Sequence, residues 1–188
     1  TENYYARETY HLNMGSNKYY GVESLGIDYS TVYGQWSSDE DLMKAYLDIL
    51  DETVEGKFMS YITTVTSHQP YVSSSIYGDI YLDMTKDTDY PLEIRRYLSK
   101  LKVVDNAIGI LVNGLEERDL LDDTIIVIFG DHYPYGIDLD TLGTIMTRDL
   151  NDYENEKVPL LIYNPSLTEK VYDTYTSYIN LTPTIANL

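Results

Sequence analysis

The side chains best suited to chemistry lie in Gly130-Asp131-His132. They directly follow residues 124–129, an apolar and β-branched run that predicts a strand buried on both faces. Ligands of open α/β sheets bind at the carboxyl ends of strands, and Gly130 permits a turn that aims both side chains into one site. A carboxylate beside an imidazole suits a divalent metal ion. A surface β-turn fits the same residues and stays open as the alternative.

A second polar sequence, Ser-His-Gln-Pro-Tyr at residues 67–71, follows another predicted strand over residues 57–66. A histidine just past the end of a strand is well placed to bind a ligand or to donate a proton. His68 is therefore a candidate ligand or proton donor. The alternative is an ordinary loop histidine without a chemical role.

Tyr5 and Arg7 lie near the N-terminus in Tyr-Tyr-Ala-Arg-Glu, residues 4–8, and His11 follows closely. A guanidinium binds two phosphate oxygens at once, so Arg7 is a candidate ligand for a phosphate group. The alternative is a surface loop in which Arg7 pairs with Glu8 or another acid. The sequence of this region leaves both interpretations open.

Helices and strands alternate along the chain and would position these candidates. Ser37 and Glu40 form a capping box that predicts a helix to about Thr53, with its acidic residues facing solvent. Apolar residues at helical spacing predict a long helix over 90–118, which Asp105 interrupts as either a buried acid or an exposed edge residue. The other expected elements are irregular structure over 1–36, a surface excursion over 72–89, helices over 139–150 and 179–188, and a strand over 158–163.

This alternation predicts an α/β fold with a largely parallel sheet flanked by helices. The predicted strands are few for a complete sheet, so we expect the chain to hold only part of a domain. The net charge of -18 argues against nucleic acid and against electrostatic docking on anionic lipid. The absence of cysteine excludes disulfides and thiolate metal sites. No apolar run reaches the length of about 18 residues that a membrane span needs, and no signal peptide is visible.

The order of these landmarks resembles the C-terminal half of a sulfatase-type catalytic domain of the alkaline phosphatase superfamily. The landmarks are a long helix, an Asp-Asp-Thr turn, the strand before Gly-Asp-His, a Val-Pro-Leu strand and a final Asn-Leu-Thr-Pro-Thr segment. Residues 5–8, 67–71 and 130–133 further resemble three motifs of the lipoteichoic acid synthase and phosphoglycerol transferase branch. Those motifs are aromatic-Asn-Arg-Asp, Asn-His-aromatic-Pro and Gly-Asp-His-Tyr. Ala6 differs from the asparagine of the first motif.

This resemblance implies a metal-dependent phosphoglycerol transferase that acts on a phosphatidylglycerol-type lipid and builds a cell-surface glycerol phosphate polymer. Asp131 and His132 would bind the divalent ion, Mn²⁺ or Mg²⁺. His68 would stabilise the oxygens of the substrate phosphate or protonate the leaving alcohol. Arg7, with Tyr5 beside it, would hold the glycerol phosphate headgroup.

The resemblance also implies that residues 1–188 are the C-terminal part of one catalytic domain. In this branch, the N-terminal half supplies a further acidic metal ligand and the nucleophilic threonine. We therefore expect the N-terminal half to be absent from this chain and the chain alone to be inactive. Its parent protein would be anchored by N-terminal transmembrane helices and act on the extracellular face of a bacterial cell membrane.

Other functions remain open at this point. A sulfatase, a phosphodiesterase or a phosphoethanolamine transferase would keep the same fold and change the reaction. The last of these tends to carry more histidines around zinc, whereas this chain holds only His11, His68 and His132. A non-catalytic extracellular module is a further alternative, because 21 tyrosines would suit glycan-binding loops.

Overall fold

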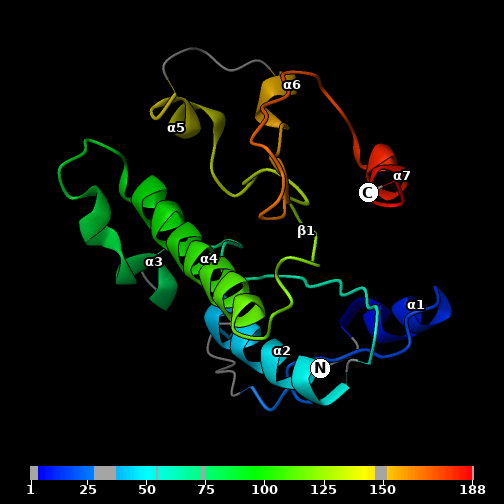
Figure 1. Ribbon diagram of the computed structural model, residues 1–188. Coiled ribbons are helices and arrows are strands. Elements are labelled where there is room, and N and C mark those ends of the chain that lie inside the picture. Colours follow the sequence, from blue (N-terminus) through cyan, green and yellow to red (C-terminus); the bar gives the residue numbers. More distant parts are fainter. Residues whose placement is uncertain (1–3, 28–36, 54, 73–74, 147–151, 188) are drawn as a thin grey trace.

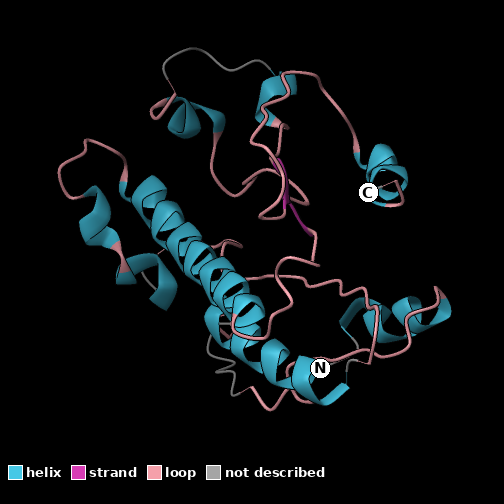
Figure 2. Ribbon diagram, viewed as in Figure 1, coloured by secondary structure: helices cyan, strands magenta, loops and turns pink. Residues whose placement is uncertain are grey.

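The computed structural model describes residues 4–27, 37–53, 55–72, 75–146 and 152–187. Helices dominate these residues and the strands are short (Figure 2). Figure 1 shows α4 crossing the centre of the view, with α2 beside its C-terminal end and α3 beside its N-terminal part. In chain order the elements are η1 (Tyr4–Ala6), α1 (Arg7–Asn13), α2 (Asp39–Thr53), α3 (Ile76–Ile80), η2 (Leu82–Thr85), α4 (Leu92–Glu116), β1 (Ile126–Phe129), α5 (Leu139–Gly143), α6 (Asp152–Asn155), β2 (Leu160–Tyr163), η3 (Tyr178–Asn180) and α7 (Leu181–Ile185).

The main core joins α2, α4 and β1, and its apolar residues follow the helical spacing of the sequence. The two helices approach closely, because a Cβ added to Gly114 of α4 would collide with the side chain of Leu47 on α2. β1 is attached to the same core through its first residue, Ile126. The buried members of this core are Met43, Leu47, Leu50, Ala107, Leu111, Leu115, Leu121 and Ile126.

Shortening a buried side chain of this core should lower the free energy of unfolding of the protein. Leu115 lies at the centre of the core and is 2% exposed, so Leu115→Ala should lower the free energy of unfolding by about 2–5 kcal/mol. Urea denaturation followed by circular dichroism measures this change. The same substitution at Leu92, which is 47% exposed on the same helix, should cost no more than about 0.5 kcal/mol. Equal losses for both variants would contradict this view of the core.

The described sheet is a single antiparallel pair, β1 with β2, in which Ile126 lies opposite Tyr163 and Phe129 opposite Leu160. The expectation of a largely parallel sheet is therefore wrong for this pair of strands. The strand predicted over residues 57–66 is also wrong, since residues 58–65 form no ladder. A strand is defined by hydrogen bonds to a neighbour, and this stretch has no partner strand among the described residues.

Two N-terminal expectations also need correction. Residues 7–13 form α1 rather than irregular structure, after left-handed backbone at Tyr5 (φ 53°) and Ala6 (φ 54°). α2 begins one residue later than predicted, because the hydroxyl of Ser38 accepts the hydrogen bond from the N–H of Glu40 (3.1 Å). The Ser37 hydroxyl is buried and has no hydrogen-bond partner among the described residues.

Residues 72–89 hold more regular structure than predicted, whereas the two helices predicted near the C-terminus are shorter than predicted. The excursion at 72–89 contains α3 and η2, and Ser99 of α4 donates to the carbonyl of Tyr77 (2.8 Å) and accepts from the N–H of Tyr81 (2.9 Å). The helix predicted over 139–150 is described as α5 only to Gly143, and residues 147–150 lie outside the described residues. The last helix, predicted over 179–188, is the short pair η3 and α7.

Candidate active site

Gly130 directly follows β1, and both its N–H and its carbonyl are hydrogen-bonded. Its N–H donates to the carbonyl of Pro159 (3.3 Å), and its own carbonyl accepts from the hydroxyl of Tyr178 (2.6 Å). A Cβ at this position would lie only 3.0 Å from Cβ of Val158. The close approach of the segment before β2 therefore explains why a glycine precedes the polar pair Asp131-His132.

Asp131 and His132 project from this turn into an exposed position. Oδ1 of Asp131 lies 3.6 Å from Nε2 of His132, and the two side chains are 80% and 40% exposed. Nδ1 of His132 lies 2.8 Å from the carbonyl oxygen of Tyr133, which can only accept, so Nδ1 carries the proton. In the neutral imidazole this leaves the lone pair on Nε2, the nitrogen that faces the carboxylate and can bind a metal.

His68 lies beside this pair although 64 positions separate it from His132 in the sequence. The two imidazole rings meet edge to face with their centroids 6.3 Å apart. Nδ1 of His68 lies 2.7 Å from the carbonyl oxygen of Gln69, so this ring too carries its proton on Nδ1. Gln69 packs tightly against the loop after His132, where a Cβ at Gly136 would lie 3.0 Å from Cβ of Gln69. The structure thus brings His68, Asp131 and His132 together.

The donor set fits part of a divalent metal site. A carboxylate oxygen suits Mn²⁺ or Mg²⁺, which prefer about six ligands, whereas an imidazole nitrogen is typical of transition-metal ions. In the part of the chain that the structure describes, no group of three or more His, Cys, Asp or Glu residues could hold a metal ion. Asp131 and His132 could therefore supply a corner of such a site, and further ligands would have to come from elsewhere.

The structure does not bring Tyr5 and Arg7 to this place. Tyr5 is 81% exposed, and α1, which begins at Arg7, lies at the edge of the molecule and away from β1 (Figure 1). The ring of His11 on α1 packs instead against the rings of Tyr61 and Tyr19, with ring centroids 5.6 Å and 6.0 Å away. A role of Tyr5 and Arg7 in substrate binding therefore stays a prediction.

Asp39 is a functional candidate that the sequence did not indicate. It is 0% exposed, which corrects the prediction that the acids of this helix face solvent. Its carboxylate accepts hydrogen bonds from the N–H groups of Val65 and Thr66 (2.8 Å each), and its own N–H donates to Oγ1 of Thr66 (3.0 Å). Burial raises the pKa of Asp39, and these hydrogen bonds partly offset that rise. An acid in the first turn of a helix has an ordinary explanation in the helix dipole, so the sequence held no signal for this contact.

Lys100 of α4 is a second such residue, and it is only 3% exposed. Its ammonium donates to the carbonyls of His68 (2.6 Å) and Pro70 (3.2 Å) and lies 5.5 Å from the ring centre of Tyr71. Burial lowers the pKa of Lys100 to about 8. The sequence did hold a signal here, because Lys100 shares the helix face of the buried Val103 and Ala107.

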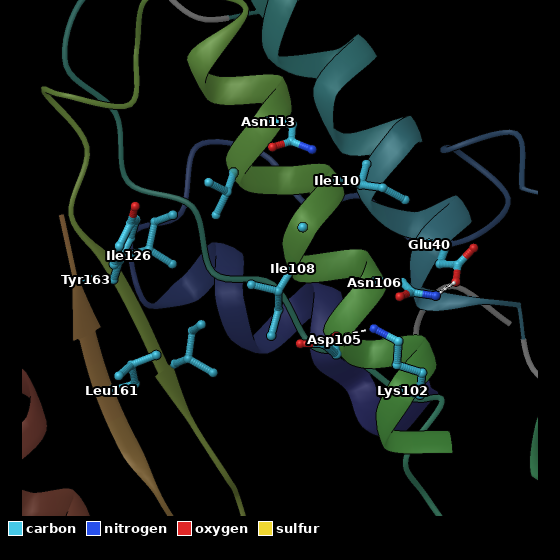
Figure 3. A pocket seen from close by; sticks show the side chains of 13 residues that line it. Glu40, Lys102, Asp105, Asn106, Ile108, Ile110, Asn113, Ile126, Leu161 and Tyr163 are labelled. Carbon is cyan, nitrogen blue, oxygen red and sulfur yellow. Dashed lines mark hydrogen bonds and ion pairs between the residues drawn. The ribbon is translucent and has the colours of Figure 1, made fainter. Parts of the chain in front are cut away.

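A groove of about 630 Å³ lies between α4 and the two strands (Figure 3). Its polar end holds Asn106, whose amide donates to Oε1 of Glu40 (2.9 Å), and the exposed ion pair of Lys102 with Asp105. Asp105 is thus the exposed edge residue of the two alternatives. The apolar lining includes Ile108, Ile110, Val112, Ile126, Ile128 and Leu161. None of the predicted site residues lines this groove, so it is separate from the three clustered side chains.

Comparisons with known proteins identify several relatives of this chain. The chain is 22% identical to lipoteichoic acid synthase 1 of Bacillus subtilis over 191 residues, covering 100% of this chain and 29% of that protein. It is 24% identical to lipoteichoic acid synthase of Staphylococcus saprophyticus over 130 residues, covering 69% and 19%. It is also 33% identical to choline-sulfatase of Rhizobium meliloti over 96 residues, covering 50% and 18%. The chain therefore spans less than a third of each of these relatives.

The fold is found in a solved structure. The crystal structure of the lipoteichoic acid synthase LtaP from Listeria monocytogenes superimposes with a TM-score of 0.68 at 23% identity, covering 90% of this chain and 42% of that one. This match confirms the predicted sulfatase-like α/β fold, present here in part. Among the described helices, none has the length and apolar character needed to cross a membrane. Residues 1–188 all match the family model described as Sulfatase, and the chain therefore belongs to the sulfatase family.

Proposed function

We propose that the protein containing this chain is a metal-dependent phosphoglycerol transferase that builds a cell-surface glycerol phosphate polymer from a phosphatidylglycerol-type lipid. The observation that carries this proposal is the meeting of His68 with Asp131 and His132 at the end of β1. Similarity to lipoteichoic acid synthases, including one of known structure, supports this reaction over others of the family.

The roles of the residues follow from their chemistry. Asp131 and His132 would hold Mn²⁺ or Mg²⁺, and the bound ion would lower the pKa of the attacking hydroxyl and neutralise charge on the phosphoryl group. His68 faces the same space and stabilises the phosphate oxygens or protonates the leaving alcohol. Arg7, with Tyr5, would hold the glycerol phosphate headgroup by a bidentate contact, which requires α1 to lie nearer to the end of β1 than the structure places it.

The remaining parts of the site come from outside this chain. Asp131 and His132 cannot fill the coordination sphere of either ion, and a threonine from the N-terminal half of the domain acts as nucleophile. Residues 1–188 are the C-terminal part of the domain and are inactive alone. The complete protein is anchored in the bacterial cell membrane and acts on its extracellular face. Its partners are the lipid headgroup and the growing polymer, not nucleic acid, in line with the charge of -18.

Transfer from lipid is the decisive test. The complete protein, incubated with fluorescent phosphatidylglycerol and Mn²⁺, should release diacylglycerol, and EDTA should stop that release. A second candidate function is sulfate ester hydrolysis, which the 33% identity to a choline-sulfatase favours. Hydrolysis of choline sulfate without release of diacylglycerol would reject the transferase and establish that alternative.

A further inference from the structure

The segment that carries His68, residues 65–70, has no regular secondary structure of its own, yet two buried charged side chains hold it. Asp39 of α2 binds the backbone N–H groups that precede His68. Lys100 of α4 binds the backbone carbonyls of His68 itself and of the residue two positions later. The signs match the chemistry, because a carboxylate only accepts hydrogen bonds and an ammonium only donates them. His68 is therefore bracketed from both sides.

Both charges are buried beside the segment that they hold. In the ranges described, Asp39 and Lys100 form no ion pair with any other residue. A buried charge without an opposite charge costs free energy, even where hydrogen bonds replace part of its hydration. The raised pKa of Asp39 and the lowered pKa of Lys100 have this burial as their main cause. Each charge is held in the interior by hydrogen bonds to backbone groups of residues 65–70, so the two side chains tie this segment to α2 and α4.

The two helices that carry these charges also hold the other half of the site. α2 and α4 are packed against each other through the main core, with Gly114 allowing the close approach. β1 is anchored in that core by Ile126 and leads directly into Asp131-His132. The packed helices α2 and α4 therefore position both His68 and the metal-binding pair, Asp131 and His132. The ring separation of 6.3 Å between His68 and His132 depends on these contacts.

We propose that Asp39 and Lys100 are positioning residues that fix His68 opposite Asp131 and His132. They act through the backbone of residues 65–70, and in the described structure neither forms a hydrogen bond with Asp131 or His132. The catalytic consequence rests on the proposed function of His68, whereas the structural consequence does not. The helix frame is set by the core, so loss of either charge releases the segment and leaves the helices in place.

The test uses the complete protein with Asp39→Asn and Lys100→Met, which remove each charge at nearly unchanged size. Matched controls are Asp41→Asn and Lys102→Met, the same substitutions two residues further along the same helices. Asp41 and Lys102 are exposed and form surface ion pairs with Lys44 and Asp105. Two properties are measured for each variant, namely kcat with KM for transfer from phosphatidylglycerol, and amide hydrogen exchange of residues 65–68 by mass spectrometry.

Displacement of His68 should weaken transition-state contacts more than substrate binding. Asp39→Asn and Lys100→Met should each lower kcat by about 10- to 100-fold with KM within about threefold, since a shift of 1 Å at a catalytic group can cost about 100-fold. Exchange at residues 65–68 should accelerate at least tenfold while exchange within α4 stays at the wild-type rate. Both controls should behave as wild type.

Each proposal can fail separately. Wild-type kcat and wild-type exchange in both Asp39→Asn and Lys100→Met would overturn the positioning role, even if the transferase is confirmed. If the complete protein transfers nothing from phosphatidylglycerol, hydrogen exchange decides alone. Faster exchange confined to residues 65–68 then supports the positioning role, and unchanged exchange rejects it. If Asp39→Asn does not fold, Lys100→Met carries the test.

Discussion

Replacing Asp131 or His132 with alanine is expected to abolish metal-dependent transfer by the complete protein. Each substitution removes a proposed ligand that no neighbouring acid or histidine among the described residues replaces. The rate of diacylglycerol release should fall by more than about 100-fold, the upper range for losing an outer hydrogen-bond partner of a metal ligand. Initial rates at increasing Mn²⁺ measure the loss, and metal analysis of the purified variants should show less bound ion.

Asp123→Ala is the matched control for Asp131→Ala. Asp123 is an exposed acid in the turn before β1, so its loss changes the net charge equally and leaves the end of the strand intact. This control should keep wild-type rate and metal content. Undiminished activity in either Asp131→Ala or His132→Ala would reject the metal assignment.

Replacing His68 with alanine is expected to lower kcat by about 100- to 10,000-fold, the range for loss of a general acid or base. His68 faces His132 at 6.3 Å between ring centres but is not a proposed metal ligand. Metal content and Mn²⁺ dependence should therefore stay at the wild-type level while turnover collapses. This combination distinguishes His68 from the metal-binding pair. Loss of bound metal in His68→Ala would show that His68 is a ligand, and unchanged kcat would show that it has no catalytic part.

The elements that the sequence predicted well are those with long apolar periods. α4 extends over Leu92–Glu116 within the predicted range 90–118, because its buried face repeats over many turns and packs on one core. β1, at Ile126–Phe129, lies within the strand predicted over residues 124–129, but it is not buried on both faces, because only Ile126 is buried and the other three residues are half-buried. His68 lies beside Asp131 and His132 in the one site that the resemblance implied, although the strand predicted before His68 is absent from the described sheet.

The parts that the sequence missed depend on distant residues. The extended stretch 58–65 is β-branched enough for a strand, but strand formation requires a neighbour that the described chain does not offer. Asp39 reads as a routine acid in a first helical turn until Val65 and Thr66 donate to it. Lys100 shares the helix face of buried residues, but only the folded chain shows that two carbonyls accept hydrogen bonds from its ammonium. These contacts arise only in the folded chain, so local propensity cannot reveal them.

The antiparallel pairing of β1 with β2 has a consequence for how such a protein can diversify. The register places Leu160 opposite Phe129. The excursion over residues 133–157 therefore leaves from and returns to the same end of the strand pair. A longer loop between fixed ends costs little, because closure entropy grows only with the logarithm of its length. Insertions in this excursion would therefore leave Gly130-Asp131-His132 in place.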